Sequence, residues 1–368
     1  MRKGARPHPG AQVDDDCAMQ DDPLAPSGRA RRDRAWERRF ALVAIVVAAA
    51  SLVVANRSDL PVAWRAARHA RPGFLIAGLV LVAIAMFNQA GFHAAAQRVA
   101  GQPVRGSELV VAVSAAGFAN LVVKSGAMAG LAPMLAVARR RNRSRAATVA
   151  GYLLVNVIGH LAFACILGVG LVVLVVDGRF GVTDALAAGA FVVLSATQLA
   201  LLRAAFRSRE AVRRLYRLPR RVAARLPVLR RLVPGNDTPS ETEHPDELFE
   251  AVQLIRTNRR AMLPVLGHSL GVEFVGVAEL YCVLRALGVH PHASVPIVAY
   301  AISVLFTIIG FLPGGIGFVE ASLGAVLVSF GVARGPAVAA VVLYRILELW
   351  IPMIIGLVAA RHLTREDA

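Results

Sequence analysis

Charged side chains occur inside apolar stretches near the C-terminal end of the sequence. Glu320 follows the run GFLPGGIGFV, and Arg345 and Glu348 lie together within the apolar residues 337–360. A charge exposed to hydrocarbon is costly, so each of these residues is a candidate for a functional site. Residues three apart share one face of a helix, so Arg345 and Glu348 could pair. The planar arginine fork also suits a lipid phosphate, and Glu320 could bind a cationic or hydroxylated headgroup or neutralise Arg345.

Other polar residues in apolar sequence are candidates for the same site. Lys124 could bind a lipid phosphate at a helix break or extend to the membrane surface. Glu273 is a candidate for lining a polar cavity, whereas Glu279 and Arg285 are expected to pair near the membrane surface. His160 is a weaker candidate, because a lone buried histidine is more often satisfied by a neighbouring helix.

The sequence offers no catalytic constellation. We find no nucleophile–His–acid set, no paired acids at catalytic spacing and no cluster with metal-ligand spacing. We therefore predict no catalytic residues, no metal site and no cofactor, and we do not expect an enzyme.

The element that must position the charged residues is an interrupted helix over residues 310–320. Proline cannot donate a backbone hydrogen bond, and glycine weakens a helix. In hydrocarbon, a broken helix needs partners for its polar backbone groups from the protein or from water in a cavity. We expect a helix–break–helix hairpin near residues 297–335 that lines a polar cavity; a kinked span with a capping carboxylate is the alternative. The residues that form the break are Pro313, Gly314, Gly315 and Gly317.

Composition places the chain among membrane proteins. Of its 368 residues, 56% are hydrophobic, and they occur in runs long enough to cross a bilayer. The formal charge is +17, and the arginines cluster between the apolar runs. This pattern favours contact with anionic lipid headgroups over contact with nucleic acid. The predicted class is an all-α, polytopic integral membrane protein.

Hydropathy divides most of the sequence into two membrane halves. Residues 36–202 form the first half, with a hairpin near residues 108–138, and residues 261–362 form the second, with the glycine hairpin. Besides the two hairpins we expect six full spans. They cover residues 40–55, 73–96, 146–176, 186–202, 263–287 and 337–360.

The remaining residues form tails and one large loop. Residues 1–35 are predicted to be a disordered basic cytosolic tail, and residues 363–368 a short cytosolic tail. Residues 203–260 are predicted to be a cytosolic loop, basic at first and acidic later. The run from Arg203 to Arg231 suits interfacial helices on an anionic membrane surface, with a solvated basic loop as the alternative. A short amphipathic helix is expected before the next span, because apolar residues recur at helical spacing from Leu248 to Ile255.

The two halves resemble each other at a fixed offset. A shift of 188 residues places Gly126 on Gly314 and His160 on Glu348, and it aligns the break around residues 124–130 with that around residues 312–318. The arginines place the first hairpin on the cytosolic side and the second on the outer side. The halves are therefore predicted to be inverted repeats with re-entrant hairpins, an architecture typical of alternating-access transporters.

The run from Pro313 to Glu320, followed by Arg345-Ile346-Leu347-Glu348, resembles the C-terminal motif of a known family. This is the lysylphosphatidylglycerol synthase transmembrane family, a flippase-like group that includes the membrane half of the bacterial multiple-peptide-resistance-factor proteins. The similarity covers about residues 40–360. It implies lipid translocation between leaflets and a first hairpin built on an Asn and a Pro–Gly turn. Asn120, Gly126 and the nearby Gly130 fit that hairpin, although Ser125 stands in place of the proline.

These patterns together predict a translocase for a lipid or a lipid-linked sugar. Its substrate would be an anionic-phosphate lipid, either a phospholipid or an isoprenoid-linked lipid, that crosses through a polar cavity at the midplane. The sequence has no P-loop, so transport would be passive, ion-coupled or driven by consumption of the product. The aminoacyl-transferase domain of fused family members is not expected, because the chain ends eight residues after the last span.

Two other functions stay open. The chain could be a non-transporting scaffold for a separate lipid-modifying enzyme, or a transferase embedded in the membrane. In each case we expect a multi-pass protein of the cell membrane with both termini in the cytosol. Self-association into a homo-oligomer also stays open.

Overall fold

The structure is a computed structural model that describes residues 61, 64–65, 68–122, 128–207, 245–257, 260–310 and 312–365. All of them belong to one structural unit, residues 47–368. Every regular element within the described residues is a helix, which confirms the predicted all-α class. The tail predicted over residues 1–35, the span predicted over residues 40–55, and Lys124 and Gly126 lie outside the described residues. So does most of the arginine-rich run that ends at Arg231.

Five helical stretches are long and apolar enough to cross a membrane. Four of them have 25 to 32 residues and the stretch Asp184–Leu201 has 18, and a bilayer's hydrocarbon core requires roughly 17–25. They match five of the six predicted spans, and the sixth is the span over residues 40–55. Four are the helices α3 (Pro72–Val99), α6 (Arg145–Val176), α7 (Val182–Arg207) and α11 (Met262–Ala286). The fifth joins α14 (Arg334–Arg345), the π-helical segment η3 (Ile346–Trp350) and α15 (Ile351–Arg365).

Shorter helices form two interrupted segments at the predicted breaks. The apolar helices α4, α12 and α13 have 17, 16 and 12 residues, so each alone is too short to cross a bilayer. That the two segments are re-entrant in a membrane stays a prediction. The first segment contains α4 (Gly106–Val122), η1 (Met128–Gly130) and α5 (Leu131–Arg140). The second contains α12 (Ser294–Ile309), η2 (Pro313–Gly315) and α13 (Phe318–Ser329).

The helices repeat at the offset seen in the sequence. Gly106 and Ser294, the first residues of α4 and α12, are 188 residues apart. The same shift places α3 on α11, α5 on α13, and α6 on the stretch from α14 to α15, each within about two residues. The repeat therefore holds for the order and length of the helices, and not only for scattered glycines.

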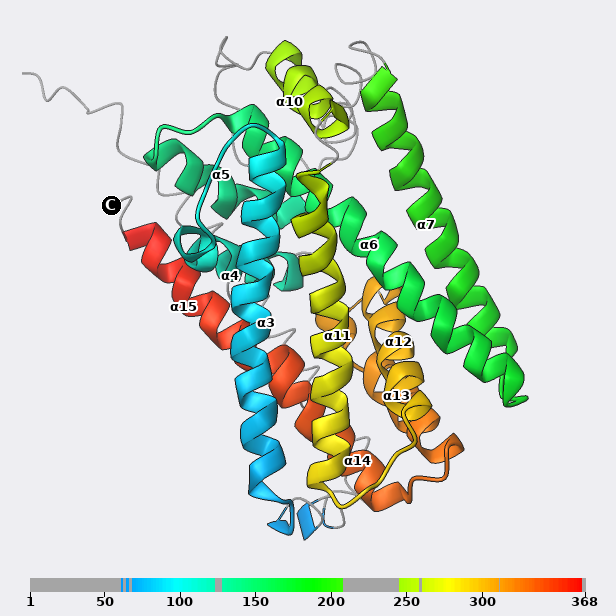
Figure 1. Cartoon of the computed structure of the whole chain (residues 1–368). Helices are drawn as coiled ribbons and strands as arrows, with labels where there is room; N and C mark the ends of the chain where they lie inside the picture. Colours follow the sequence, from blue (N-terminus) through cyan, green and yellow to red (C-terminus); the bar gives the residue numbers. More distant parts are fainter. Residues whose placement is uncertain are drawn as a thin grey trace, which may run out of the picture. The chain divides into compact units, whose positions relative to one another are not determined.

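The first helices of the two halves, α3 and α11, lie side by side and run in opposite directions (Figure 1). At one end, the Arg71 amide donates to the Ala286 carbonyl over 2.8 Å. Further along, the Asn88 amide nitrogen donates to the His268 carbonyl over 2.9 Å, and the Asn88 amide oxygen lies 2.7 Å from the His268 ring. Equivalent helices that run antiparallel are what two halves of opposite orientation require.

Each interrupted segment packs against the long helical stretch that follows the interrupted segment of the other half. The α4 helix packs on α15, where Gly356 lies so close to Ser114 and Phe118 that a side chain would not fit. The α12 helix packs on α6 through a buried apolar cluster that includes Phe163 and Ile302. Because α4 packs on a helix of the second half and α12 packs on a helix of the first, each break is supported by helices from both halves.

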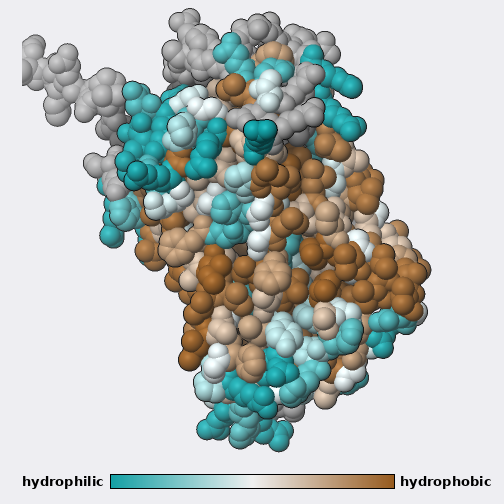
Figure 2. All heavy atoms as spheres, in the orientation of Figure 1, coloured by the Kyte–Doolittle hydropathy of each residue, from teal (hydrophilic) through white to brown (hydrophobic). Residues whose placement is uncertain are grey.

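The outer surface carries apolar side chains where a membrane would lie. Figure 2 shows hydrophobic residues across a middle zone of one face and hydrophilic residues at both ends of it. Among the exposed side chains are Phe87, Val172 and Ile354, at 65%, 63% and 56% exposure. Apolar exposure on this scale is unusual in water and normal against lipid.

A separate short helix, α10 (Pro245–Thr257), agrees with the amphipathic helix predicted from Leu248 to Ile255. Its Ala251 and Ile255 are buried in a cluster with residues of α3 and α6, including Val99 and Ala147. Its apolar face therefore packs on the ends of membrane helices.

Candidate functional site

The second break is shaped by glycines in left-handed conformations. The α12 helix ends where Gly310 becomes extended, and Gly314 and Gly315 have φ of 62° and 65°. A Cβ at Gly315 would lie 2.9 Å from Thr307 Cα, so no larger residue fits there without moving backbone. Pro313 in η2 supplies no N–H, which prevents the helix from continuing. The chain therefore turns back on itself at this point and leaves backbone carbonyls that need partners.

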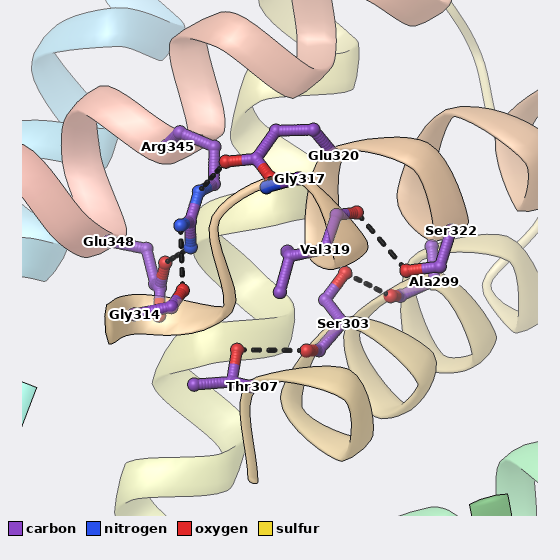
Figure 3. Close-up of polar contacts among 10 residues, drawn as sticks. All are labelled: Ala299, Ser303, Thr307, Gly314, Gly317, Val319, Glu320, Ser322, Arg345 and Glu348. Atoms are coloured by element: carbon purple, nitrogen blue, oxygen red, sulfur yellow. Dashed lines mark hydrogen bonds and ion pairs between the residues drawn. The ribbon is translucent and has the colours of Figure 1, made fainter. Parts of the chain in front are cut away.

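Arg345 supplies such a partner and joins the break to the last long stretch. Its Nη2 donates to the Gly314 carbonyl over 2.8 Å, its Nε to Glu320 Oε1 over 2.8 Å and its Nη1 to Glu348 Oε2 over 2.9 Å. Figure 3 shows the guanidinium at the centre of these contacts. Arg345 is only 1% exposed, and all three of its nitrogens are bonded within the protein. We name Glu320, Arg345 and Glu348 the charged triad.

The two carboxylates of the charged triad differ in what else they do. Glu320 accepts from Arg345 through one oxygen and from the Gly317 amide through the other, so it also caps the first turn of α13. Its side chain is 5% exposed, whereas that of Glu348 is 30% exposed. Two carboxylates face one guanidinium, and Glu348 is the partner that surrounding molecules can reach.

The local sequence explains why the triad sits on a distorted helix. Pro352 lacks an N–H, so the carbonyl four residues earlier, that of Glu348, loses its ordinary helical partner. The π-helical segment η3 spans this position. Such wide turns recur at functional sites because they re-aim side chains without ending the helix.

A second polar group lies beside the triad on α11 and α12. The Tyr300 hydroxyl donates to Glu273 Oε2 over 3.0 Å, and both residues are buried. Gly276 makes this contact possible, because the Tyr300 ring lies where a side chain at Gly276 would stand. The hydroxyl of Tyr344, the residue before Arg345, is buried without a hydrogen-bond partner. Glu273 lies in the interior, and its predicted place at a polar cavity stays a prediction. The sequence analysis did not single out either tyrosine.

The described contacts at the first break, on either side of residues 123–127, join neutral groups. Asn120 Oδ1 accepts from the Gly130 amide over 2.6 Å, and Asn120 Nδ2 donates to the Tyr152 hydroxyl over 2.9 Å. Gly130 is buried against Tyr152 and Asn120, which leave no room for a side chain. Asn120 therefore fastens the two sides of the first break to α6.

The two breaks approach each other at their ends. A Cβ placed on Gly314 would lie 3.0 Å from Cδ1 of Leu121, which follows Asn120 in α4, and 2.9 Å from Leu349 Cδ1. Among the predicted binding residues, the structure brings together Glu320, Arg345 and Glu348, with Glu273 nearby on α11. Asn120 itself bonds Gly130 and Tyr152, and its neighbour Leu121 is the residue that lies beside Gly314.

Two expectations do not match the described contacts. His160 does not join the triad: its Nδ1 lies 2.7 Å from the Asn156 carbonyl one turn earlier, and its ring stacks on Phe191. Glu279 and Arg285 form no ion pair in the part of the chain that is described, so their predicted pairing is wrong. Glu279 is only 4% exposed, and Arg285 lies over the Phe74 ring, 5.4 Å from its centroid. Residues six apart on a helix point to different sides, which explains the error.

The polar cavity predicted around the triad does not coincide with a cavity that the described residues form elsewhere. That cavity, of about 630 Å³, lies between the end of α6 and the loops after α11 and α13. None of the triad residues lines it, because their side chains are packed against one another. Its lining includes Val176, Asp177, His290, His292 and Phe330. No group of three His, Cys, Asp or Glu side chains among the described residues could hold a metal ion.

Comparison with known proteins agrees with the family suggested by the motif. A UPF0104 membrane protein of Methanothermobacter thermautotrophicus is 34% identical over 110 residues, which is 30% of this chain and 31% of that protein. The chain thus matches about a third of that relative's length. The family described as "Lysylphosphatidylglycerol synthase TM region" matches residues 40–356 of this chain. This range includes both breaks and the charged triad. The chain belongs to the lysylphosphatidylglycerol synthase TM-region family.

Proposed function

We propose that this protein is a lipid translocase that moves a lipid with an anionic phosphate headgroup between the leaflets of the cell membrane. The observation that carries the proposal is the charged triad at a helix break within a membrane segment. A charge at the bilayer centre costs about 2.5–3.5 kcal/mol on insertion scales, so intramembrane charges mark substrate pathways more often than simple anchors. A lipid headgroup that crosses hydrocarbon needs such a pathway.

Arg345 and Glu348 give the substrate a point of entry. Each of the three guanidinium nitrogens of Arg345 already donates one hydrogen bond within the protein, and the side chain is buried, so we expect a phosphate oxygen to reach the guanidinium by displacing one of these partners. Glu348 is the most exposed of these partners, and its carboxylate occupies Nη1 alone. A phosphate oxygen that displaced Glu348 would keep the guanidinium hydrogen-bonded while Glu320 and Gly314 held it in place.

The arrangement of the helices supports movement as well as binding. The antiparallel α3 and α11 and the exchanged packing of α4 and α12 suit two halves that rock about a shared site. Inverted repeats and re-entrant segments are part of this proposal. The phosphate of an isoprenoid-linked lipid would meet the same guanidinium as that of a phospholipid.

The proposal is tested by reconstituting the purified protein in vesicles with a fluorescent phospholipid in both leaflets. An impermeant quencher reports the outer-leaflet fraction, and we expect faster exchange than in vesicles without protein. Arg345→Lys should slow exchange by about tenfold or more, because a point charge replaces the fork. Arg334→Lys, on an exposed arginine of α14, is the matched control and should exchange at the wild-type rate.

The same vesicles separate the rival functions. Recovered lipid should be chemically unchanged; a new lipid product would indicate a transferase. Intact lipid that does not exchange faster than in empty vesicles would contradict the translocase and favour a scaffold.

The proposed orientation places both termini and residues 203–260 in the cytosol, with the basic run against anionic lipid. Ser240→Cys should react with an impermeant thiol reagent only after lysis. Labelling of intact cells would reverse the orientation.

A further inference from the structure

The interior beside the charged triad holds more acid than base. Two carboxyl groups, those of Glu320 and Glu348, bond the guanidinium of Arg345. Two more, those of Glu273 and Glu279, are buried on α11, which packs on α14, and have no basic partner among the described residues. Ionised carboxylates that are buried and unpaired are too costly to keep, so such groups bind a compensating cation or a proton.

Two tyrosines on neighbouring helices belong to one buried cluster. Tyr300 on α12 donates to Glu273, and Tyr344 on α14 directly precedes Arg345. Tyr344 is 1% exposed, and its hydroxyl has no hydrogen-bond partner. A buried hydroxyl without a partner is a vacant donor and acceptor position, which is costly unless it is used in another state.

The surroundings of these acids are apolar. Tyr300 and Tyr344 belong to a buried cluster with Leu280, Leu284 and Leu347. Glu320 on α13 is occupied by Arg345 and Gly317, and His160 on α6 bonds its own helix. On the α3 side, the Asn88 amide is taken by His268. The groups left to exchange an ion are therefore the carboxyls of Glu273, Glu279 and Glu348 and the two tyrosine hydroxyls.

We propose that Glu273 and Glu279, the buried acids without a basic partner, bind protons, and that exchange of these protons through Glu348 couples lipid movement to proton movement. Glu348, the partly exposed acid, takes a proton from water onto a carboxylate oxygen and passes it to the buried acids. The proton returns to water on the other side when the lipid has crossed. Chains of acids and hydroxyls of this kind act as proton relays in membrane transporters.

A protonated Glu348 also connects the two sites. Neutral Glu348 attracts Arg345 less, so its place on Nη1 becomes available to a phosphate oxygen. Protonation would thus favour lipid binding, and deprotonation would favour release. This coupling rests on the proposed translocase function.

The proton site itself can be tested without transport. Infrared spectroscopy of the purified protein in lipid should show a protonated-carboxyl band at neutral pH that fades as the pH rises. Glu273→Gln and Glu279→Gln should each reduce the band, and Glu279→Asp should retain it. Glu108→Gln, at a partly buried ion pair outside this cluster, should leave the band unchanged. A band that is absent, or unchanged in both glutamine variants, overturns the proton site.

The coupling is tested in the lipid-exchange vesicles with an imposed pH difference. If one proton moves per lipid, a difference of about one pH unit should shift the steady-state leaflet ratio by about tenfold in the wild type. Glu279→Gln should abolish this shift. Exchange that ignores the pH gradient, or that follows a sodium gradient instead, overturns the coupling and leaves the translocase intact. No exchange under any condition overturns the translocase and the coupling, while the infrared result still decides the proton site.

Discussion

The two breaks occupy equivalent places in the two halves and are closed by different chemistry. At the first, a neutral amide, Asn120, accepts from the Gly130 amide and donates to Tyr152. At the second, a buried guanidinium, Arg345, donates to the Gly314 carbonyl and to two carboxylates. Both arrangements satisfy backbone groups that an interrupted helix leaves open.

The described contacts of the second break, unlike those of the first, include buried charges, and the proposed function rests on them. A neutral amide would satisfy either break at little cost, whereas a buried ion triad carries a large desolvation penalty and often adds no stability. The second break therefore holds more charge than structure requires. The first break is the structural reference against which the second can be tested.

The largest expected effect comes from removing the guanidinium. Arg345→Met leaves Glu320 buried without its partner and should lower the free energy of unfolding by about 3–5 kcal/mol. Denaturation in mixed micelles would measure the loss. Arg334→Met, at an exposed arginine of α14, should change it by less than about 0.5 kcal/mol.

A triple variant sharpens this result. Replacing Glu320 and Glu348 by Gln together with Arg345→Met removes the stranded charges, so it should recover most of the lost stability without restoring lipid exchange. A double replacement of Arg345 and Glu348 is insufficient, because the Nε contact with Glu320 would be lost. Full lipid exchange in the triple variant would make the triad purely structural.

The next effect concerns the glycine at the second break. Gly314→Ala should be destabilising twice over, through its φ of 62° and through contact with Leu349 and Leu121. Gly178→Ala is the matched control, because Gly178 has φ of 65° and open space around it. We expect about 1–2 kcal/mol for the control from the backbone alone. Gly314→Ala should lower the free energy of unfolding by a further ~1–3 kcal/mol, because the new methyl group overpacks the break. An equal loss in the two variants would show that the surrounding side chains move aside at little cost.

At the first break, Asn120→Ala should lower the free energy of unfolding by about 1–3 kcal/mol, because it leaves the Gly130 amide and the Tyr152 hydroxyl without partners. Lipid exchange per folded molecule should change little. Thr197→Ala, which removes only an exposed bond to Val193 within its own helix, is the control. Loss of lipid exchange in a stable Asn120 variant would end the distinction between the two breaks.

The smallest effect is a dependence on pH at the start of the first segment. The side-chain hydrogen bond from Arg143 holds the pKa of Glu108 below its ordinary value. A lowered pKa adds stability above the unfolded pKa of about 4.3, and this stability is lost as the pH falls through the lower, folded value. The stability difference between wild type and Glu108→Gln should therefore be small at neutral pH and vanish in acid. A difference that grew in acid would contradict the ion pair.

The sequence alone determined the membrane class, the five spans that lie within the described residues, the positions of both breaks and the offset of 188 residues between the two halves. These features depend on local signals: the length of apolar runs, and proline or glycine within them. It also indicated that Arg345 and Glu348 share a face, because helical geometry fixes neighbours three residues apart.

Only the tertiary structure decided which distant groups meet. The bonds of Arg345 to Glu320 and Gly314 span 25 and 31 residues, and that of Tyr300 to Glu273 spans 27. The pairing expected for Glu279 failed, and His160 turned to its own helix. Partners of this kind depend on how α11, α12, α13 and α14 pack, and on glycines such as Gly276 that let rings approach a backbone. The periodicity of one helix predicts which of its own residues share a face, but it does not predict which residues of another helix pack against that face.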